Sequence, residues 1–206
     1  MTENFIDTVN NQLIKDLGYD VNFRRVENVG PKVSKELLRD GLIAIALSLA
    51  AMLFYIWIRF EWQFSLGAIA ALIHDVLITI GIFAFLSYEI NLSIVAAILT
   101  IVGYSMNDTV VIFDRIRENL RKNSKISITE ISNISTNETL SRTLITSVTT
   151  LLALFSIFIF GGAILKGFSF AMIIGVVVGT FSSIFVATPM LKYTKVNQKT
   201  ILKEEE

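Results

Sequence analysis

The sequence predicts an all-α membrane protein that crosses the bilayer five times. Hydrophobic residues make up 53% of the 206 residues, and the mean hydropathy of +0.62 is well above that of an ordinary soluble domain. Five apolar runs reach the roughly 17 to 25 residues that a helix needs to cross a bilayer. The runs are continuous rather than alternating, which favours helices over a β-barrel. The predicted spans are residues 42–58, 65–86, 92–113, 144–165 and 168–190.

Residues 1–40 precede the first span and are predicted to be the end of a small α+β domain together with its connector. The apolar spacing in TENFIDTVNNQLIKDLG predicts an amphipathic helix that ends at Gly18, and the alternation in YDVNFRRVE predicts a strand. Pro31 lies where the next helix is expected to begin, a position that tolerates proline. Because so short a piece cannot bury a core by itself, we expect residues upstream of it to complete the domain.

Basic residues in the flanking segments set the predicted orientation. Eleven Lys and Arg residues fall on one side of the five spans, and only Lys166 falls on the other. The basic side is predicted to be cytoplasmic, and it holds both the segment 114–143 and the tail 192–206. Residues 1–40 are then placed outside although they contain six basic residues. We expect this conflict to reflect a missing upstream transmembrane helix.

The cytoplasmic segment between the third and fourth spans is predicted to be helical. Ser127 with Glu130, and Ser135 with Glu138, have the spacing of capping boxes. They predict a short helix followed by a second helix that enters the fourth span.

Composition and motifs exclude several classes of protein. The 18 basic and 18 acidic residues balance, so no bulk positive charge points to nucleic acid. The absence of cysteine excludes disulfides and thiolate chemistry. The sequence has no nucleotide-binding loop, serine-hydrolase elbow or metalloprotease motif, and its single His has no metal-ligand spacing around it. We therefore predict no enzymatic activity, metal or cofactor.

Polar residues inside the predicted spans are the informative positions for function. Tyr104, Asp108 and Arg115 fall on one side of the third span, with Ser105 on its flank. An ionised carboxylate facing lipid costs at least about 2.5 to 3.5 kcal/mol, so Asp108 is expected to face other helices or a wet cavity. Arg142, at the start of the antiparallel fourth span, is its expected partner.

Asp108 and Arg142 are the candidate proton-pathway residues. Burial favours the neutral form of a carboxyl and a nearby guanidinium favours the ionised form, so the carboxyl can exchange a proton as that partner approaches or withdraws. The alternatives stay open. Asp108 can instead be a structural hydrogen-bonding group between helices, and Arg142 can simply extend to the membrane interface.

Three further polar residues are predicted to support this site. Asn107 precedes Asp108, and His74 and Asp75 lie near the middle of the second span, about 15 Å from its cytoplasmic end. Consecutive residues on a helix diverge by about 100°, so His74 and Asp75 are not expected to form one site, and a packed polar contact is favoured for His74.

Small and hydroxyl residues in the last two spans are interpreted as architectural. Gly175 and Gly179 form a small-residue face that continues to Ser182 and Ser183, a pattern that permits close helix packing. The Ser and Thr row at the start of the fourth span is expected to bond to backbone carbonyls one turn earlier.

Four stretches closely resemble the SecD/SecF family of protein-export membrane proteins, on its SecF side, within the resistance-nodulation-division superfamily. They are VGPKVSKELLRDG, IHDVLITIG, VGYSMNDTVVIFDRIREN and TLSRTLITSVTTLLALFSIFIFGG. The resemblance covers roughly residues 20–190. It implies five helices of a six-helix bundle that follow the end of a periplasmic domain, in an N-terminally truncated chain.

The resemblance also implies a function. Family members work with SecD as a unit that assists the SecYEG channel and promotes export of preproteins across the bacterial cytoplasmic membrane. This unit is embedded in the lipid of that membrane. It is driven by the proton gradient and uses no cofactor. The Asp of the NDT motif and the Arg of LSRT are the family's proton-pathway residues, and they correspond here to Asp108 and Arg142. The alternative is a non-motor structural subunit that stabilises SecD or the channel. A related proton-antiport exporter of small molecules is a third, remote option.

Overall fold

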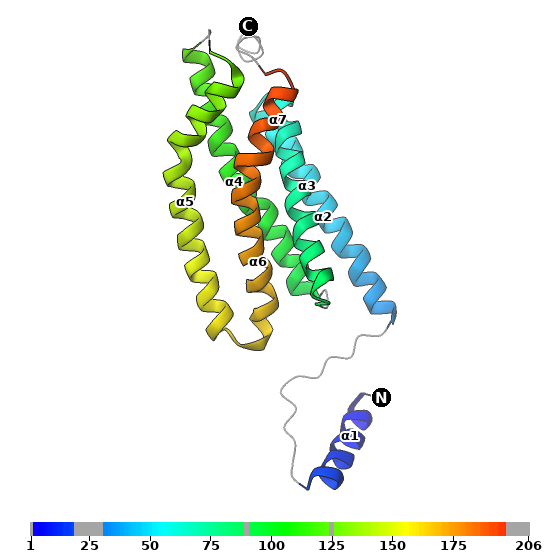
Figure 1. Cartoon of the computed structure of the whole chain (residues 1–206). Coiled ribbons are helices and arrows are strands. Elements are labelled where there is room, and N and C mark those ends of the chain that lie inside the picture. Colours follow the sequence, from blue (N-terminus) through cyan, green and yellow to red (C-terminus); the bar gives the residue numbers. More distant parts are fainter. Residues whose placement is uncertain (1, 19–30, 89–90, 124–125, 197–206) are drawn as a thin grey trace. The chain divides into compact units, whose positions relative to one another are not determined.

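The computed structural model describes residues 2–18, 31–88, 91–123 and 126–196, as Figure 1 shows. The chain divides between Asp40 and Gly41 into two units, which are described separately.

The first unit contains helix α1, Thr2–Leu17. This helix confirms the amphipathic helix predicted from the apolar spacing. It ends at Gly18, whose φ of +74° lies in the left-handed region that glycine adopts without steric cost. Helix α2, Pro31–Arg59, begins at the predicted proline and runs from this unit into the second. The predicted strand in YDVNFRRVE lies outside the described residues.

The second unit is a bundle of long apolar helices. Within the described residues, five helices are long and apolar enough to cross a membrane, as predicted. After α2 they are α3 (Trp62–Phe85), α4 (Leu92–Lys122), α5 (Ile128–Phe160) and α6 (Gly162–Ser182), the last continued by the π-helical turn η1 (Ser183–Ala187) and α7 (Thr188–Tyr193).

Helix α4 is the centre of the bundle. It packs against α3, α5 and α6 (Figure 1), and half of its most apolar window is buried, against 11% for α2. At one end of the core the ring of Phe113 meets Phe64 edge-on, with centroids 5.2 Å apart, and contacts Phe60 as well. Side chains of α4 therefore make up much of the buried interior of the bundle.

The segment between α4 and α5 differs in part from the prediction. Ser127 caps α5, and its Oγ accepts from the backbone N–H of Glu130 as predicted. The second capping box is wrong, because Ser135 lies inside one continuous helix and its Oγ accepts a hydrogen bond from Asn119 of α4. A residue pattern typical of a helix start is also compatible with a helix interior when a neighbouring helix supplies the hydrogen bond.

The ends of some helices also differ from the predicted spans, because a helix can continue into polar sequence where the hydropathy pattern stops. α4 continues to Lys122 and α5 begins at Ile128, because the helices extend through polar sequence beyond the apolar runs. α5 ends at Phe160, before the predicted end at residue 165, and the turn precedes the predicted link at Lys166. Gly162, with φ of +74°, places the turn there.

Candidate functional site

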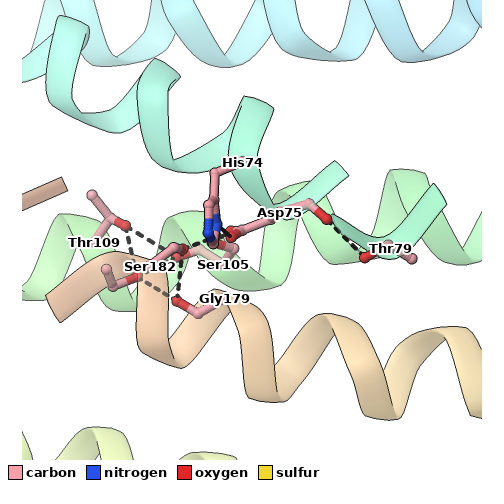
Figure 2. A network of polar contacts seen from close by, with 8 residues as sticks. His74, Asp75, Thr79, Ser105, Thr109, Gly179 and Ser182 are labelled. Carbon is pink, nitrogen blue, oxygen red and sulfur yellow. Dashed lines mark hydrogen bonds and ion pairs between the residues drawn. The ribbon is translucent and has the colours of Figure 1, made fainter. Parts of the chain in front are cut away.

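Asp75 of α3 joins three helices at the middle of the bundle. Its side chain is 1% exposed. Oδ2 accepts hydrogen bonds from Ser105 Oγ of α4 at 2.5 Å and from Ser182 Oγ of α6 at 2.8 Å. Oδ1 lies 3.0 Å from Nδ1 of His74. We call Asp75, His74, Ser105 and Ser182 the Asp75 cluster, and Figure 2 shows the carboxyl between the three helices.

The contact between His74 and Asp75 corrects a prediction. The two side chains were not expected to form one site, because their Cα positions diverge by about 100° around the helix. The structure brings them together because a His ring and a carboxyl are long enough to meet across that angle (Figure 2). His74 also stacks on Phe181 of α6, with ring centroids 6.4 Å apart. The packed polar contact favoured for His74 is therefore observed.

A second set of hydroxyls ties α4 to the start of the π-helical turn. Thr109 Oγ1 lies 2.8 Å from Ser183 Oγ. The Ser183 hydroxyl is also within hydrogen-bonding distance of two backbone carbonyls, those of Ser105 and Gly179. Both side chains are buried, at 1% and 0% exposed. The polar groups at this contact between α4 and α6 are thus paired with one another.

Glycines allow this close approach of α4 and α6. A Cβ atom added to Gly175 would lie 2.2 Å from Ile101 Cγ1, and one added to Gly179 would lie 2.9 Å from the Cβ of Ser105. Only a residue without a side chain fits at either position. The small-residue face predicted from the sequence therefore lies directly against α4.

Asp108 differs from Asp75 in lacking partners. It is 3% exposed, yet its Oδ2 is buried without a hydrogen-bond partner among the described residues. Asp108 follows Ser105 by three residues on α4, so it lies one turn away on a neighbouring face. The antiparallel register of α4 and α5, set by Tyr104 with Thr150 at 3.3 Å, places it about level with Thr146.

Arg142 lies near this level on α5 but is exposed. No hydrogen bond or ion pair joins it to Asp108 in the part of the chain that the structure describes, although its charge acts on that carboxyl through space. The next residue, Thr143, is 1% exposed and its hydroxyl also lacks a hydrogen-bond partner there. The expected direct pairing of Asp108 with Arg142 is therefore not seen among the described residues, and their functional coupling stays a prediction.

The remaining predicted polar residues take different positions. Tyr104 is half-buried and donates to Thr150, while Asn107 is exposed and lines a groove between α2 and α4. The Thr row of α5 bonds largely to carbonyls one turn earlier, as expected, for example Thr146 to Arg142 O. Within the described residues, no cluster of three or more His, Asp or Glu side chains is arranged to hold a metal.

Of the two hydroxyl partners of Asp75, Ser105 was predicted as a supporting polar residue, whereas Ser182 was predicted only as part of a packing face. Ser182 is 107 residues away in sequence, and its only signal was membership of the small-residue face after Gly179. A serine in such a face can serve packing alone, so the sequence did not distinguish packing from hydrogen bonding to a buried carboxylate.

Comparison with known proteins shows the family of this chain. The family model described as "Protein export membrane protein SecD/SecF, C-terminal" matches residues 9–197. The chain belongs to the SecD/SecF family. It is 51% identical to the protein translocase subunit SecF of Cereibacter sphaeroides over 91% of its own length and 58% of that protein. It is 49% identical to SecF of Rickettsia bellii over 90% of its length and 61% of that protein.

Solved structures of SecDF share the fold. The structure of SecDF from Thermus thermophilus, described as a translocon-associated membrane protein, superposes with a TM-score of 0.77 at 42% identity. The match covers 81% of this chain and 23% of that one. SecDF in the super-membrane-facing form gives a TM-score of 0.73 at 38% identity, over 86% of this chain and 24% of the other.

The chain spans about six-tenths of the length of the SecF relatives it matches. Its membership of the SecD/SecF family and its five long apolar helices make it a multi-pass membrane protein.

Proposed function

We propose that this chain acts as a SecF-type subunit of the Sec protein translocase, working with SecD and driven by the proton gradient. In this proposal the unit assists the SecYEG channel in exporting preproteins across the bacterial cytoplasmic membrane. The relatives named as SecF translocase subunits and the SecDF structures support a transport role rather than an enzymatic one. The excess of basic residues on one side supports a cytoplasmic C-terminus.

Asp108 carries the proposal. A carboxyl within a membrane span is costly, and such groups are typical of proton relays in pumps and transporters. Asp108 is buried beside the hydrogen-bonded Asp75 cluster, but one of its oxygens has no partner among the described residues. An oxygen that no protein donor occupies is free to take up a proton or to meet a water or a moving side chain.

Arg142 is the proposed modulator of that proton. Its charge acts on Asp108 without an ion pair between them. A small shift of α5 along α4 would bring the guanidinium closer and favour the ionised carboxyl, and the reverse shift would favour the neutral form. A two-position helix of this kind is the element through which protonation becomes movement.

The energy available from the gradient is sufficient for such a switch. Each proton that crosses a potential of 100 mV releases about 2.3 kcal/mol. A differential free energy of about 5.5 kcal/mol inverts a two-state population from 1:99 to 99:1, so one proton biases the equilibrium and a few invert it.

A structural subunit that holds SecD or the channel together is the second candidate function. The observation that favours it is the close packing of α4 on α6, where Gly175 leaves no room for a side chain and the Asp75 carboxyl binds three helices. In that case Asp108 would be one more polar group in a rigid scaffold.

Replacing Asp108 distinguishes the two functions. We expect Asp108→Asn to abolish proton-dependent stimulation of preprotein export by membrane vesicles that contain the chain with SecD. Membrane insertion and co-purification with SecD should be unchanged, since Asn has nearly the same shape. Asp114→Asn is the matched control, because Asp114 lies on the same helix but is exposed and paired with Arg59.

The structural function makes the opposite prediction. Asp108→Asn would then leave proton-dependent stimulation intact, and a bulky residue at Gly175 would abolish co-purification with SecD. Retained stimulation in Asp108→Asn would overturn the proton-driven role.

A further inference from the structure

A groove of about 940 Å³ runs between α5 and the continuous helix formed by α6, η1 and α7. The two helices that form it are antiparallel, because α5 ends at Phe160 and α6 turns back at Gly162 to pack against it, with Ser147 Oγ 2.7 Å from Thr180 Oγ1. α5 has 33 residues and is therefore about 50 Å long, well beyond the roughly 30 Å of a hydrocarbon core. A groove along its first half therefore crosses the boundary between the membrane and water.

One end of the groove is polar and carries a single positive charge. It is lined by Ser132, Asn133, Thr136 and Asn137 of α5 and by Lys192 of α7. None of the residues that line the groove is acidic. A ligand that is complementary to this end of the groove has a negatively charged or strongly hydrogen-bonding group.

The polar side chains at this end lack protein partners. Among the described residues, the Ser132 hydroxyl and the Asn133 and Asn137 amides make no hydrogen bonds, and Lys192 makes no ion pair. Ser132 is nevertheless only 7% exposed. Buried polar groups are normally hydrogen-bonded, as the hydroxyls between α4 and α6 are. The Ser132 hydroxyl lines the groove and is not itself fully enclosed, so it is open to a hydrogen bond from a molecule bound there.

The other end of the groove is apolar. Leu144 of α5 faces Val177, Phe181 and Phe185 across it. The rings of Phe181 and Phe185 pack together, with centroids 4.8 Å apart and planes tilted by 30°, and form one wall of the groove. From Lys192 to Val177 the helix rises about 22 Å, a length that suits a polar headgroup followed by most of one acyl chain.

The π-helical turn shapes this wall. η1 spans Ser183–Ala187, and Thr188 Oγ1 bonds back to Ser183 O at 2.9 Å. Pro189, which follows in α7, lines the groove and has no N–H to donate. Single π turns are rare and are frequently found at functional sites.

We infer that this groove binds one anionic phospholipid, with its phosphate at Lys192, Ser132 and Asn133 and an acyl chain along Leu144 and Phe181. The unpaired donors and the lone cation recognise the phosphate, and the apolar wall accepts the chain. A transmembrane helix from a partner fits less well, because its backbone would leave the donors at the polar end unsatisfied. The inference is independent of the proton-driven role.

Native mass spectrometry of the full chain in detergent tests this inference. The purified protein is mixed with phosphatidylglycerol or with phosphatidylcholine of the same acyl chains, and bound lipid is counted as the activation energy is raised. We expect one phosphatidylglycerol to be retained in preference to phosphatidylcholine. Lys192→Gln should weaken phosphatidylglycerol retention by about tenfold or more, as expected for loss of a charge-assisted hydrogen bond.

Two further variants control for charge and for folding. Lys166→Gln removes an exposed lysine at the opposite end of α6 and should leave retention unchanged. Val177→Trp narrows the apolar end at a position that is 54% exposed, and should reduce retention while the helix content by circular dichroism stays the same.

Equal retention of the two lipids by the wild type would overturn the inference, as would equal losses in Lys192→Gln and Lys166→Gln. A polypeptide that co-purifies with the full complex and protects Asn133→Cys from labelling, with no lipid bound, would assign the groove to a protein partner instead.

Discussion

Asp75 of α3 and Asp108 of α4 are both buried carboxyls in the same bundle, and Asp108 lies one turn from Ser105, a partner of Asp75, but the surroundings of the two carboxyls are opposite. Asp75 faces two serine hydroxyls and a histidine nitrogen. Asp108 has a buried oxygen without any partner among the described residues. Hydrogen bonds to a charged group are worth about 1.5 to 3 kcal/mol each, while an unpaired buried polar group costs free energy.

The difference separates a structural role from a role in transport. A carboxyl whose acceptors are all occupied stabilises the packing of α3, α4 and α6. A carboxyl whose acceptor is free is retained at a cost to stability, and such a cost is typical of functional sites. The predictions below test whether stability and function divide between the two residues in this way.

The largest expected effect comes from removing each carboxyl. Asp75→Ala should lower the free energy of unfolding by about 3 kcal/mol, because it leaves the buried hydroxyls of Ser105 and Ser182 without their acceptor. Asp108→Ala should lower it by less than about 1 kcal/mol or raise it, since no protein hydrogen bond to Oδ2 is lost. Steric trapping in bicelles measures both. Equal losses of unfolding free energy in the two variants would contradict the assignment of a structural role to Asp75 alone.

Overpacking the contact between α4 and α6 should have the next largest effect. A methyl group at Gly175 would overlap Ile101, so Gly175→Ala should cost about 1 to 3 kcal/mol. Gly81→Ala is the control, because nothing lies within 4 Å of a Cβ built there, and it should stabilise α3 by up to about 1 kcal/mol. The same unfolding assay applies. A neutral Gly175→Ala would show that α4 and α6 do not need to be this close.

Removing one donor from the Asp75 cluster should have the smallest effect. Ser105→Ala deletes one of the hydrogen bonds to Asp75 and should cost about 0.6 to 1.7 kcal/mol, the range measured for hydrogen bonds between membrane helices. Ser156→Ala, at an exposed serine that bonds only to Leu152 O, should change stability by less than about 0.5 kcal/mol. A Ser105→Ala loss no larger than the Ser156→Ala loss would mean that Asp75 draws its stability from elsewhere.

The membrane spans and the burial of Asp108 could both be predicted from the sequence, and for the same physical reason. Long apolar runs have to be helices in lipid, and a carboxyl inside one has to turn away from lipid. Neither statement depends on which helices touch. The small-residue spacing of Gly175 and Gly179 was equally local, so the face they form could be predicted as well.

Asp75, His74 and Ser105 were predicted as supporting polar residues, but their grouping with Ser182 could not be predicted, because it depends on the register between helices. Ser105 and Ser182 are 30 and 107 residues from Asp75, and nothing in the sequence fixes how α4 and α6 are staggered against α3. The position of Arg142 was missed for a related reason. One residue on a helix turns the side chain by 100°, and the structure buries Thr143 while leaving Arg142 exposed.

Difference infrared spectroscopy on the full chain reconstituted with SecD tests the central claim most directly. Carboxyl bands are recorded across pH for the wild type, Asp108→Asn and Asp75→Asn. The account predicts a titrating carboxyl band that Asp108→Asn removes, that Asp75→Asn leaves in place, and that Arg142→Ala shifts. A band that survives in Asp108→Asn and disappears in Asp75→Asn would contradict it, because the exchanging proton would then belong to the hydrogen-bonded carboxyl.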